Sequence, residues 1–179
     1  MLKSLILALV AFAAFSTIHA QNEAAAPPPT DAQIAMIAVT ANSVDIDVAK
    51  MARQKTSNKA VKEFAETMVR DHTAVNAKAT ALVKKLGVTP EESDTSRSLR
   101  SDGDKKMEEL KAMTGAEFDK AYIDNEVNYH EAVLGVLDKT LIPNTRNAEL
   151  KSLLESARPI FVSHLEHAKK LQASLNKQD

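Results

Sequence analysis

The histidines are the residues of this chain whose type and spacing point most directly to chemistry. Four of the five lie in segments whose apolar spacing predicts helices, and His72, His130 and His164 occupy positions on the apolar stripes themselves. His167 follows His164 by one helical turn, so the two imidazoles share a helix face. An unpaired buried polar group costs roughly 1–3 kcal/mol, so each imidazole on a stripe needs a hydrogen-bond partner or a metal ion.

Carboxylates accompany these imidazoles in the predicted helices. If the chain folds back as a hairpin near residue 57, Asp45 and His72 differ by about three residues, roughly 4–5 Å of height at 1.5 Å per residue. Across the second hairpin, near residue 143, Glu126 lies nearer in height to His164 than His130 does. Imidazole and carboxylate donors suit iron, manganese, zinc or copper. The sequence therefore predicts a mid-bundle site for a divalent transition metal, with these candidate ligands: Asp45, Asp71, His72, Glu126, His130, His164 and His167.

A second interpretation needs no metal. Each histidine would donate to a carboxylate or a backbone carbonyl and thereby link the helices of a structural or protein-interaction bundle. An oxidoreductase with a non-standard metal centre is a third interpretation, and a non-covalent haem held by Met51 or Met68 is a weaker one. Ferroxidase-type di-iron bundles carry Glu-x-x-His on two helices, and this chain has no such motif. The sequence therefore favours binding or structure over catalysis.

The spacing of apolar residues predicts four long helices and no strand. Apolar residues recur at alternating steps of three and four, the period of a helix with one buried face, over about 31–55, 59–86, 115–142 and 146–176. Pro159 lies inside the last segment and should kink it, because proline removes a backbone hydrogen bond. Residues 88–114 are largely polar, with a short helix expected from about 102 to 113, and are predicted to form a crossover connection. The prediction is an all-α four-helix bundle over residues 31–176.

The N-terminal residues predict export. Residues 1–20 combine a basic start, an apolar run and a small residue at Ala20, which is typical of a cleaved signal peptide, and residues 21–30 form a Pro/Ala-rich spacer. We therefore expect a periplasmic or secreted protein whose mature chain has no membrane span. The absence of cysteine excludes disulfides, covalent haem and a lipidated N-terminal cysteine. A net charge of −1 argues against nucleic acid as a partner.

Three motifs in combination resemble a known family. They are Phe-Ala-Glu-Thr-Met-Val-Arg-Asp-His at 64–72, Phe-Asp-Lys-Ala-Tyr-Ile at 118–123 followed by His130, and His-Leu-Glu-His-Ala at 164–168. Together they resemble the bacterial domain of unknown function 4142 family, and the likeness covers about 31–175. The resemblance implies a ferritin-like four-helix bundle that is exported and has no established catalytic activity.

The resemblance also marks individual positions. The recurrent polar residues of the family fall on Asp71, His72, Asp119, His130 and His164, and an acidic residue of its first helix falls on Asp45. At His167 relatives often carry an apolar residue, so a ligand role there would be particular to this chain. We expect structural roles for Asp119, Tyr122 and Pro159.

Overall fold

The computed structural model describes residues 27–177, and every regular element in this part of the chain is helical. The long helices are α1 (Asp31–Lys55), α2 (Lys59–Leu86), α3 (Asp94–Ala112), α4 (Gly115–Val136) and α6 (Ala148–Leu175). A π-helical segment, η1 (Leu137–Leu141), and the short α5 (Ile142–Asn144) follow α4. The all-α prediction is therefore confirmed. The predicted signal peptide lies outside the described residues, as does most of the spacer.

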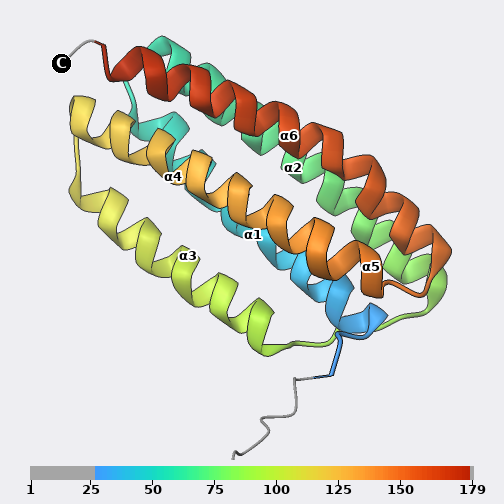
Figure 1. Ribbon diagram of the computed structural model, residues 1–179. Coiled ribbons are helices and arrows are strands. Elements are labelled where there is room, and N and C mark those ends of the chain that lie inside the picture. The colour runs from blue at the N-terminus through green and yellow to red at the C-terminus, as the bar shows by residue number, and fades with distance from the viewer. Residues whose placement is uncertain (1–26, 178–179) are drawn as a thin grey trace, which may run out of the picture.

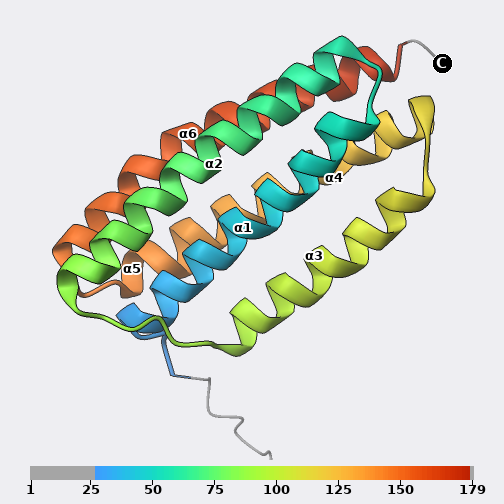
Figure 2. The same cartoon turned by 180° about the vertical axis from the view of Figure 1, so that it is seen from behind.

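Four of the long helices surround a common interior. Helix α1 runs alongside α2, α2 alongside α6, and α6 alongside α4, whereas α1 and α4 approach each other at few points (Figures 1 and 2). Helix α3 packs on the outer side of α1 and touches α4 little. None of the described helices is long and apolar enough to cross a membrane. The interior between α1, α2, α4 and α6 is the place where buried side chains from distant parts of the sequence meet.

Local capping explains where these helices begin. Thr30 forms a capping box with Gln33 at the start of α1, and the side chain of Asn58 accepts hydrogen bonds from the first turn of α2. Each cap satisfies backbone N–H groups that have no partner within the helix. Helix α2 ends at Gly87, whose φ of 64° is a left-handed conformation that glycine adopts without steric cost.

Helix α3 is longer than the sequence predicts. It begins at Asp94 rather than near residue 102, because Ser93 and Ser96 form a reciprocal capping box that starts the helix. Only Ser96 and Leu110 are buried along it, and Leu99 and Met107 are partly buried, so most of its surface faces solvent and its apolar face is narrow. At Gly103 an added Cβ would lie 2.6 Å from Cγ1 of Val44, which shows how closely α3 approaches α1 at this point.

The fold separates the buried apolar residues into two clusters. One is built around Val61, Phe64 and Met68, and the other around Ile34, Leu150 and Phe161. In each of the four surrounding helices, a buried polar residue lies between the residues that belong to the two clusters; these residues are Asp45 on α1, His72 on α2, His130 on α4 and His164 on α6. The fold therefore places a polar layer across the middle of an apolar interior.

Candidate metal centre

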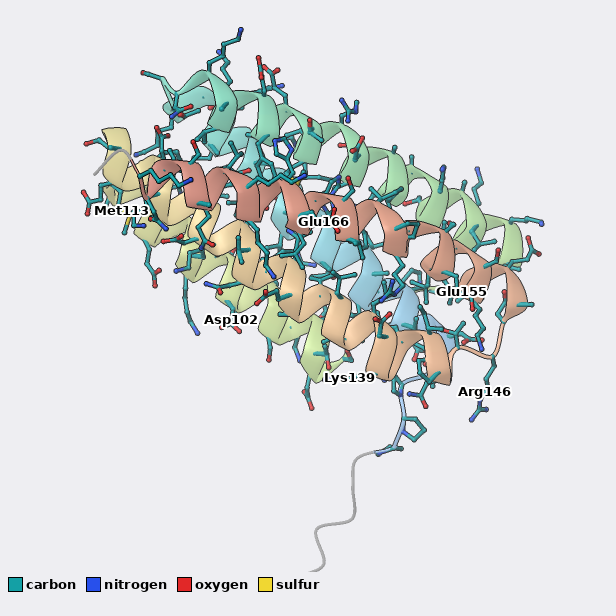
Figure 3. The ribbon with its side chains drawn as sticks, turned by 45° about the horizontal axis from the view of Figure 1, so that its top comes forward. Asp102, Met113, Lys139, Arg146, Glu155 and Glu166 are labelled. Atoms are coloured by element: carbon teal, nitrogen blue, oxygen red, sulfur yellow. The ribbon has the colours of Figure 1, made fainter. Side chains whose placement is uncertain are left out.

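The polar layer contains three histidines and two carboxylates with almost no solvent exposure. Their relative exposures are 2% for His72, 1% for His130 and 4% for His164. Asp45 is 2% exposed and Glu126, one turn before His130 on α4, is 1% exposed. By contrast, charged α6 residues such as Glu155 and Glu166 are exposed; Figure 3 shows side chains on both the inner and outer faces of the helices. Burying this many ionisable groups at one level requires a specific set of partners.

The hydrogen bond of His72 determines which of its ring nitrogens carries the proton. Its Nδ1 lies 2.7 Å from Oδ1 of Asn42. The Nδ2 of Asn42 donates to the carbonyl of Ala38 at 2.8 Å, so the amide oxygen faces the imidazole and can only accept. Nδ1 of His72 therefore donates, and Nε2 keeps a lone pair that has no hydrogen-bond partner among the described residues.

His130 and His164 follow the same pattern. Nδ1 of His130 donates to the backbone carbonyl of Glu126 at 2.9 Å, which leaves its Nε2 unpartnered among the residues described. Nε2 of His164 donates to Oδ2 of Asp71 at 3.0 Å, which leaves its Nδ1 unpartnered there too. Arg70 holds the same carboxylate through bonds of 2.7 and 3.1 Å. Each imidazole thus donates one N–H to an acceptor and keeps the other nitrogen as a buried lone pair.

The unpartnered nitrogens belong to residues that converge. One ligand atom from each of His72, His130 and His164 lies within 4.8 Å of the other two. Oδ2 of Asp45 lies 3.4 Å from Nε2 of His72 and 3.8 Å from Nε2 of His130, and neither oxygen of this carboxyl has a hydrogen-bond partner in the described chain. Lone pairs that face one another repel, whereas a cation between them is attracted to all of them. This arrangement can hold a metal ion.

Burial keeps the three imidazoles neutral. It lowers the pKa of His72 well below its usual value, and the neighbouring His130 and His164 lower it further. Burial also lowers the pKa of His130 to about 4, against the raising effect of its hydrogen bond to the Glu126 backbone. The pKa of His164 is lowered by burial although Asp71 opposes the change. A neutral imidazole is the form that binds metals, so protons compete weakly for these ligands at neutral pH.

The carboxyl groups divide into two kinds. Burial raises the pKa of Asp45 to about 8, although the Glu126 side chain opposes the rise. Burial and the neighbouring charge of Asp45 raise the pKa of Glu126 well above its usual value. Burial alone would raise the pKa of Asp71 as well, but hydrogen bonds from Arg70 and His164 outweigh it and lower that pKa. Asp71 is therefore an anionic acceptor outside the imidazole cluster, while Asp45 and Glu126 are acids that a cation would deprotonate.

The remaining sequence predictions have different outcomes. The chain spacing predicts Glu126 or His130 beside His164; the ring of His130 lies 5.4 Å from that of His164 between centroids, but the hydrogen-bond partner of His164 is Asp71. Glu126 instead forms a second cluster with Asp45 and His130, in which the ligand atoms also lie within 4.8 Å of one another. Height along a helix takes no account of the rotation of Glu126 about α4, and this rotation directs its side chain toward α1.

His167 does not join the imidazole cluster. It is exposed on α6, and its ring packs edge-on against Phe64 at 5.2 Å between centroids. Asp119 is buried, and one of its side-chain oxygens has no partner among the described residues. Tyr122 is fully buried and stacks on Phe118 at 6.2 Å, as a core residue does. Pro159 is exposed within α6, which continues to Leu175.

Two residues around the histidines were missed by sequence reasoning. Asn42 orients His72, and the ring of Phe161 stacks on that imidazole at 5.1 Å with planes 8° apart. Asn42 lies three residues before Asp45, on the same helix face, and this spacing is the signal that could have identified it. The contact of Phe161 depends on the pairing of α2 with α6, which no local pattern reveals.

These observations define an all-helical domain that buries a layer of histidines and carboxylates between its helices. The chain belongs to the family described as a domain of unknown function, DUF4142, whose model matches residues 16–171. A fragment of a DUF305 protein from Deinococcus radiodurans has a similar crystal structure, with 12% sequence identity, a TM-score of 0.69, and coverage of 83% of this chain and 99% of that chain. No curated protein matches the chain in sequence. The structural likeness supports the helical fold alone.

Proposed function

We propose that this protein binds a divalent transition metal, one of iron, manganese, zinc or copper, at the centre of a ferritin-like four-helix bundle. The ligands are His72, His130, His164 and Asp45. The observation that carries the proposal is the matched orientation of the imidazoles. Each imidazole donates its outer N–H to an acceptor, and its other nitrogen is buried and unpartnered in the described chain. One ligand atom from each of the three histidines lies within 4.8 Å of the other two.

The outer partners are those expected around metal-binding histidines. Such histidines donate their second N–H to a carboxylate, a carbonyl or a comparable acceptor, which sets the tautomer and the ring orientation. Here Asn42 serves His72, the carbonyl of Glu126 serves His130, and Asp71 serves His164. Three imidazoles, with the Asp45 carboxylate that lies beside two of them, would make four protein donors, the number typical of closed zinc sites rather than of catalytic sites with an open position. The donor set therefore favours metal holding over catalysis.

A bundle in which the histidines satisfy one another explains the geometry less well. The three unpartnered imidazole nitrogens are all acceptors in the tautomers set by Asn42, Glu126 and Asp71, and two acceptors cannot share a hydrogen bond. The protonated Asp45 carboxyl has one O–H and can donate to only one of them. A proton added to one imidazole would supply a donor, but burial lowers the pKa of all three. A metal ion supplies the positive charge without protonating the ligands.

We also propose that the protein is exported and acts in the periplasm or outside the cell. The basic start, the apolar run and Ala20 in residues 1–20 support this location. In such a compartment, a bundle of this kind would hold metal ions outside the cytoplasm. Support for the ferritin-like arrangement comes from the four helices that surround the histidine layer, with α3 as an additional helix on the outside.

Calorimetric titration with Zn²⁺ tests the metal proposal, using protein without a histidine tag and freed of metal by a chelator. We expect equimolar binding by the wild type and at least ~100-fold weaker binding by His72→Ala, because removing one of four donors opens the site. His167→Ala is the matched control, since it removes an exposed imidazole outside the cluster, and it should bind as the wild type does. Repeating the titration with Mn²⁺, Fe²⁺ and Cu²⁺ would identify the preferred metal.

Circular dichroism separates a lost ligand from a lost fold in these variants. The proposal requires His72→Ala to keep its helical spectrum while it loses the metal. A wild-type protein that binds none of the four ions, together with a His72→Ala variant that only unfolds at lower temperature, would support the structural bundle instead.

A further inference from the structure

A cavity of about 370 Å³ lies beside the candidate metal centre, and His72 is the one proposed metal ligand in its lining. It is lined by residues of α1 and α4, which approach each other at few points, and by residues of α3. Its inner end is formed by His72 and Phe161, and it extends toward Leu137 and Leu150 at the other end of the same apolar cluster. The volume is within the range of pockets that hold small organic ligands.

Small side chains explain why this space is not filled. Ala38 and Ala41 on α1, Ala132 on α4 and Ala157 on α6 line the cavity where larger residues would close it. Aromatic residues make up only 4% of the chain, so few side chains are large enough to span the gap between α1 and α4. Cavities with apolar walls do not hold water well and take up apolar molecules instead.

The exposed residues of the lining mark where the cavity opens. Ala132 and Asn128 on α4 are exposed, and Val136 is an exposed large apolar residue of the described chain, at 37%. Lys106 and Asp102 of α3 also line the cavity, with side chains 41% and 72% exposed; Figure 3 labels Asp102. The opening is therefore polar on its α3 side, while the walls inside it are apolar.

Lys106 gives this opening a positive charge that can be redirected. Its ammonium pairs with Glu109 at 2.5 Å in an i, i+3 contact, and its side chain is 41% exposed. Such surface pairs contribute little, so the ammonium can exchange this carboxylate for another at small cost. Asp102 pairs with Lys105 at 3.2 Å, which offsets its own negative charge. Lys106 is the lysine in the lining of this cavity.

We propose that the cavity binds a single-chain fatty acid, with the hydrocarbon chain between α1 and α4 and the carboxylate at Lys106. An apolar tail matches the inner walls, and an anionic head matches the ammonium at the opening. The site is separate from the metal ligands except at His72, whose ring forms part of the inner end. Binding of the fatty acid does not depend on metal being held.

Calorimetric titration with dodecanoate, and with dodecanol as an uncharged ligand of equal chain length, tests this assignment on the metal-free protein. Wild type should bind dodecanoate in an equimolar ratio and more tightly than dodecanol. Ala132→Trp places a large ring in the opening and should weaken binding of both ligands by about tenfold or more. Ala116→Trp is the matched control, because Ala116 is exposed on the same helix but does not line the cavity.

A second pair of variants tests the contribution of Lys106 to binding of the carboxylate. Lys106→Gln should weaken dodecanoate binding by about tenfold and leave dodecanol binding unchanged, because the lost contact is between charges. Lys111→Gln removes a lysine from the same helix that pairs with Glu108 in an i, i+3 contact, and should change neither. The assignment is overturned if wild type binds neither ligand, if Ala132→Trp binds like wild type, or if Lys106→Gln affects both ligands equally or neither. All of these outcomes are independent of whether Zn²⁺ binds.

Discussion

Replacing Asp45 with asparagine should make the metal-free protein more stable at alkaline pH, although Asp45 is a proposed ligand. Burial raises the pKa of this carboxyl from 3.8 to about 8. A folded-state pKa above the unfolded value means that the stabilising contribution is complete below about pH 4 and is lost as the pH rises through 8. The asparagine amide cannot ionise, so the variant avoids this loss.

The magnitude follows from the pKa shift. Each unit of difference corresponds to about 1.4 kcal/mol, so the wild type loses roughly 3–4 kcal/mol from this group between pH 5 and pH 8. His72 and His130 face Asp45 and are present in both proteins, so their own titration largely cancels in the comparison. Glu126 also faces Asp45, and the charge of Asp45 is one cause of its raised pKa, so the substitution lowers that pKa and adds to the gain of the variant at alkaline pH. Tyr122 and Tyr129 have pKa values well above 10, chiefly through burial, and remain neutral over this range.

Thermal unfolding at pH 5 and pH 8, with a chelator present, measures the effect. At pH 5 the wild-type carboxyl is protonated and therefore neutral, like the asparagine amide that replaces it, so the two proteins should have similar stability at this pH. We compare the Tm of the variant minus the Tm of wild type at the two pH values. This difference should be roughly 6–15 °C larger at pH 8 than at pH 5. Asp47→Asn, an exposed change on the same helix, should show no such pH dependence.

One result would refute this reasoning. If Asp45→Asn changes the Tm by the same amount at both pH values, the buried carboxyl does not titrate in this range. Zn²⁺ supplies a further comparison at pH 8, because a ligand that binds only the folded state raises its stability. The ion should stabilise wild type strongly and Asp45→Asn weakly.

Three further predictions concern Asp71, Pro159 and the N-terminal residues. Asp71→Asn should weaken Zn²⁺ binding by about 10–100-fold in calorimetry without loss of helicity, because it removes the anionic acceptor of His164; unchanged affinity would show that Asp71 does not orient the ring. Pro159→Ala should raise the free energy of unfolding by ~1–3 kcal/mol in urea, because alanine restores a backbone hydrogen bond of α6; a decrease would mean that the helix depends on a kink. Mass spectrometry of the exported protein should find a chain beginning near Gln21, whereas retention of Met1 would contradict the predicted signal peptide.

The long helices could be predicted because each buries one face. Apolar steps of three and four place Val61, Met68 and His72 on one side of α2, and the structure buries all three. Counting residues from the hairpin break also places Asp45 near His72, and the two lie 3.4 Å apart between Oδ2 and Nε2. Both predictions use only the period and rise of the helix, which are the same in every protein.

The other features depend on information that helical periodicity lacks. Helix α3 begins with the Ser93–Ser96 capping box and faces solvent, so its start leaves no apolar pattern. The π-helical turn at Leu137–Leu141 changes the spacing within a segment that otherwise looks continuous. The partnership of Asp71 with His164 depends on how α2 and α6 are rotated against each other, and this rotation is set by packing across the interior.

X-ray absorption spectroscopy of the protein loaded with an equimolar amount of Zn²⁺ tests the central claim most directly. The scattering pattern of the ion's neighbours reports the number of imidazole and oxygen ligands that surround it. The proposed centre predicts three imidazoles and one carboxylate oxygen, with one imidazole lost in His164→Ala and none lost in His167→Ala. A spectrum dominated by water and carboxylate oxygens, or one that changes with His167 rather than with His164, would contradict the account.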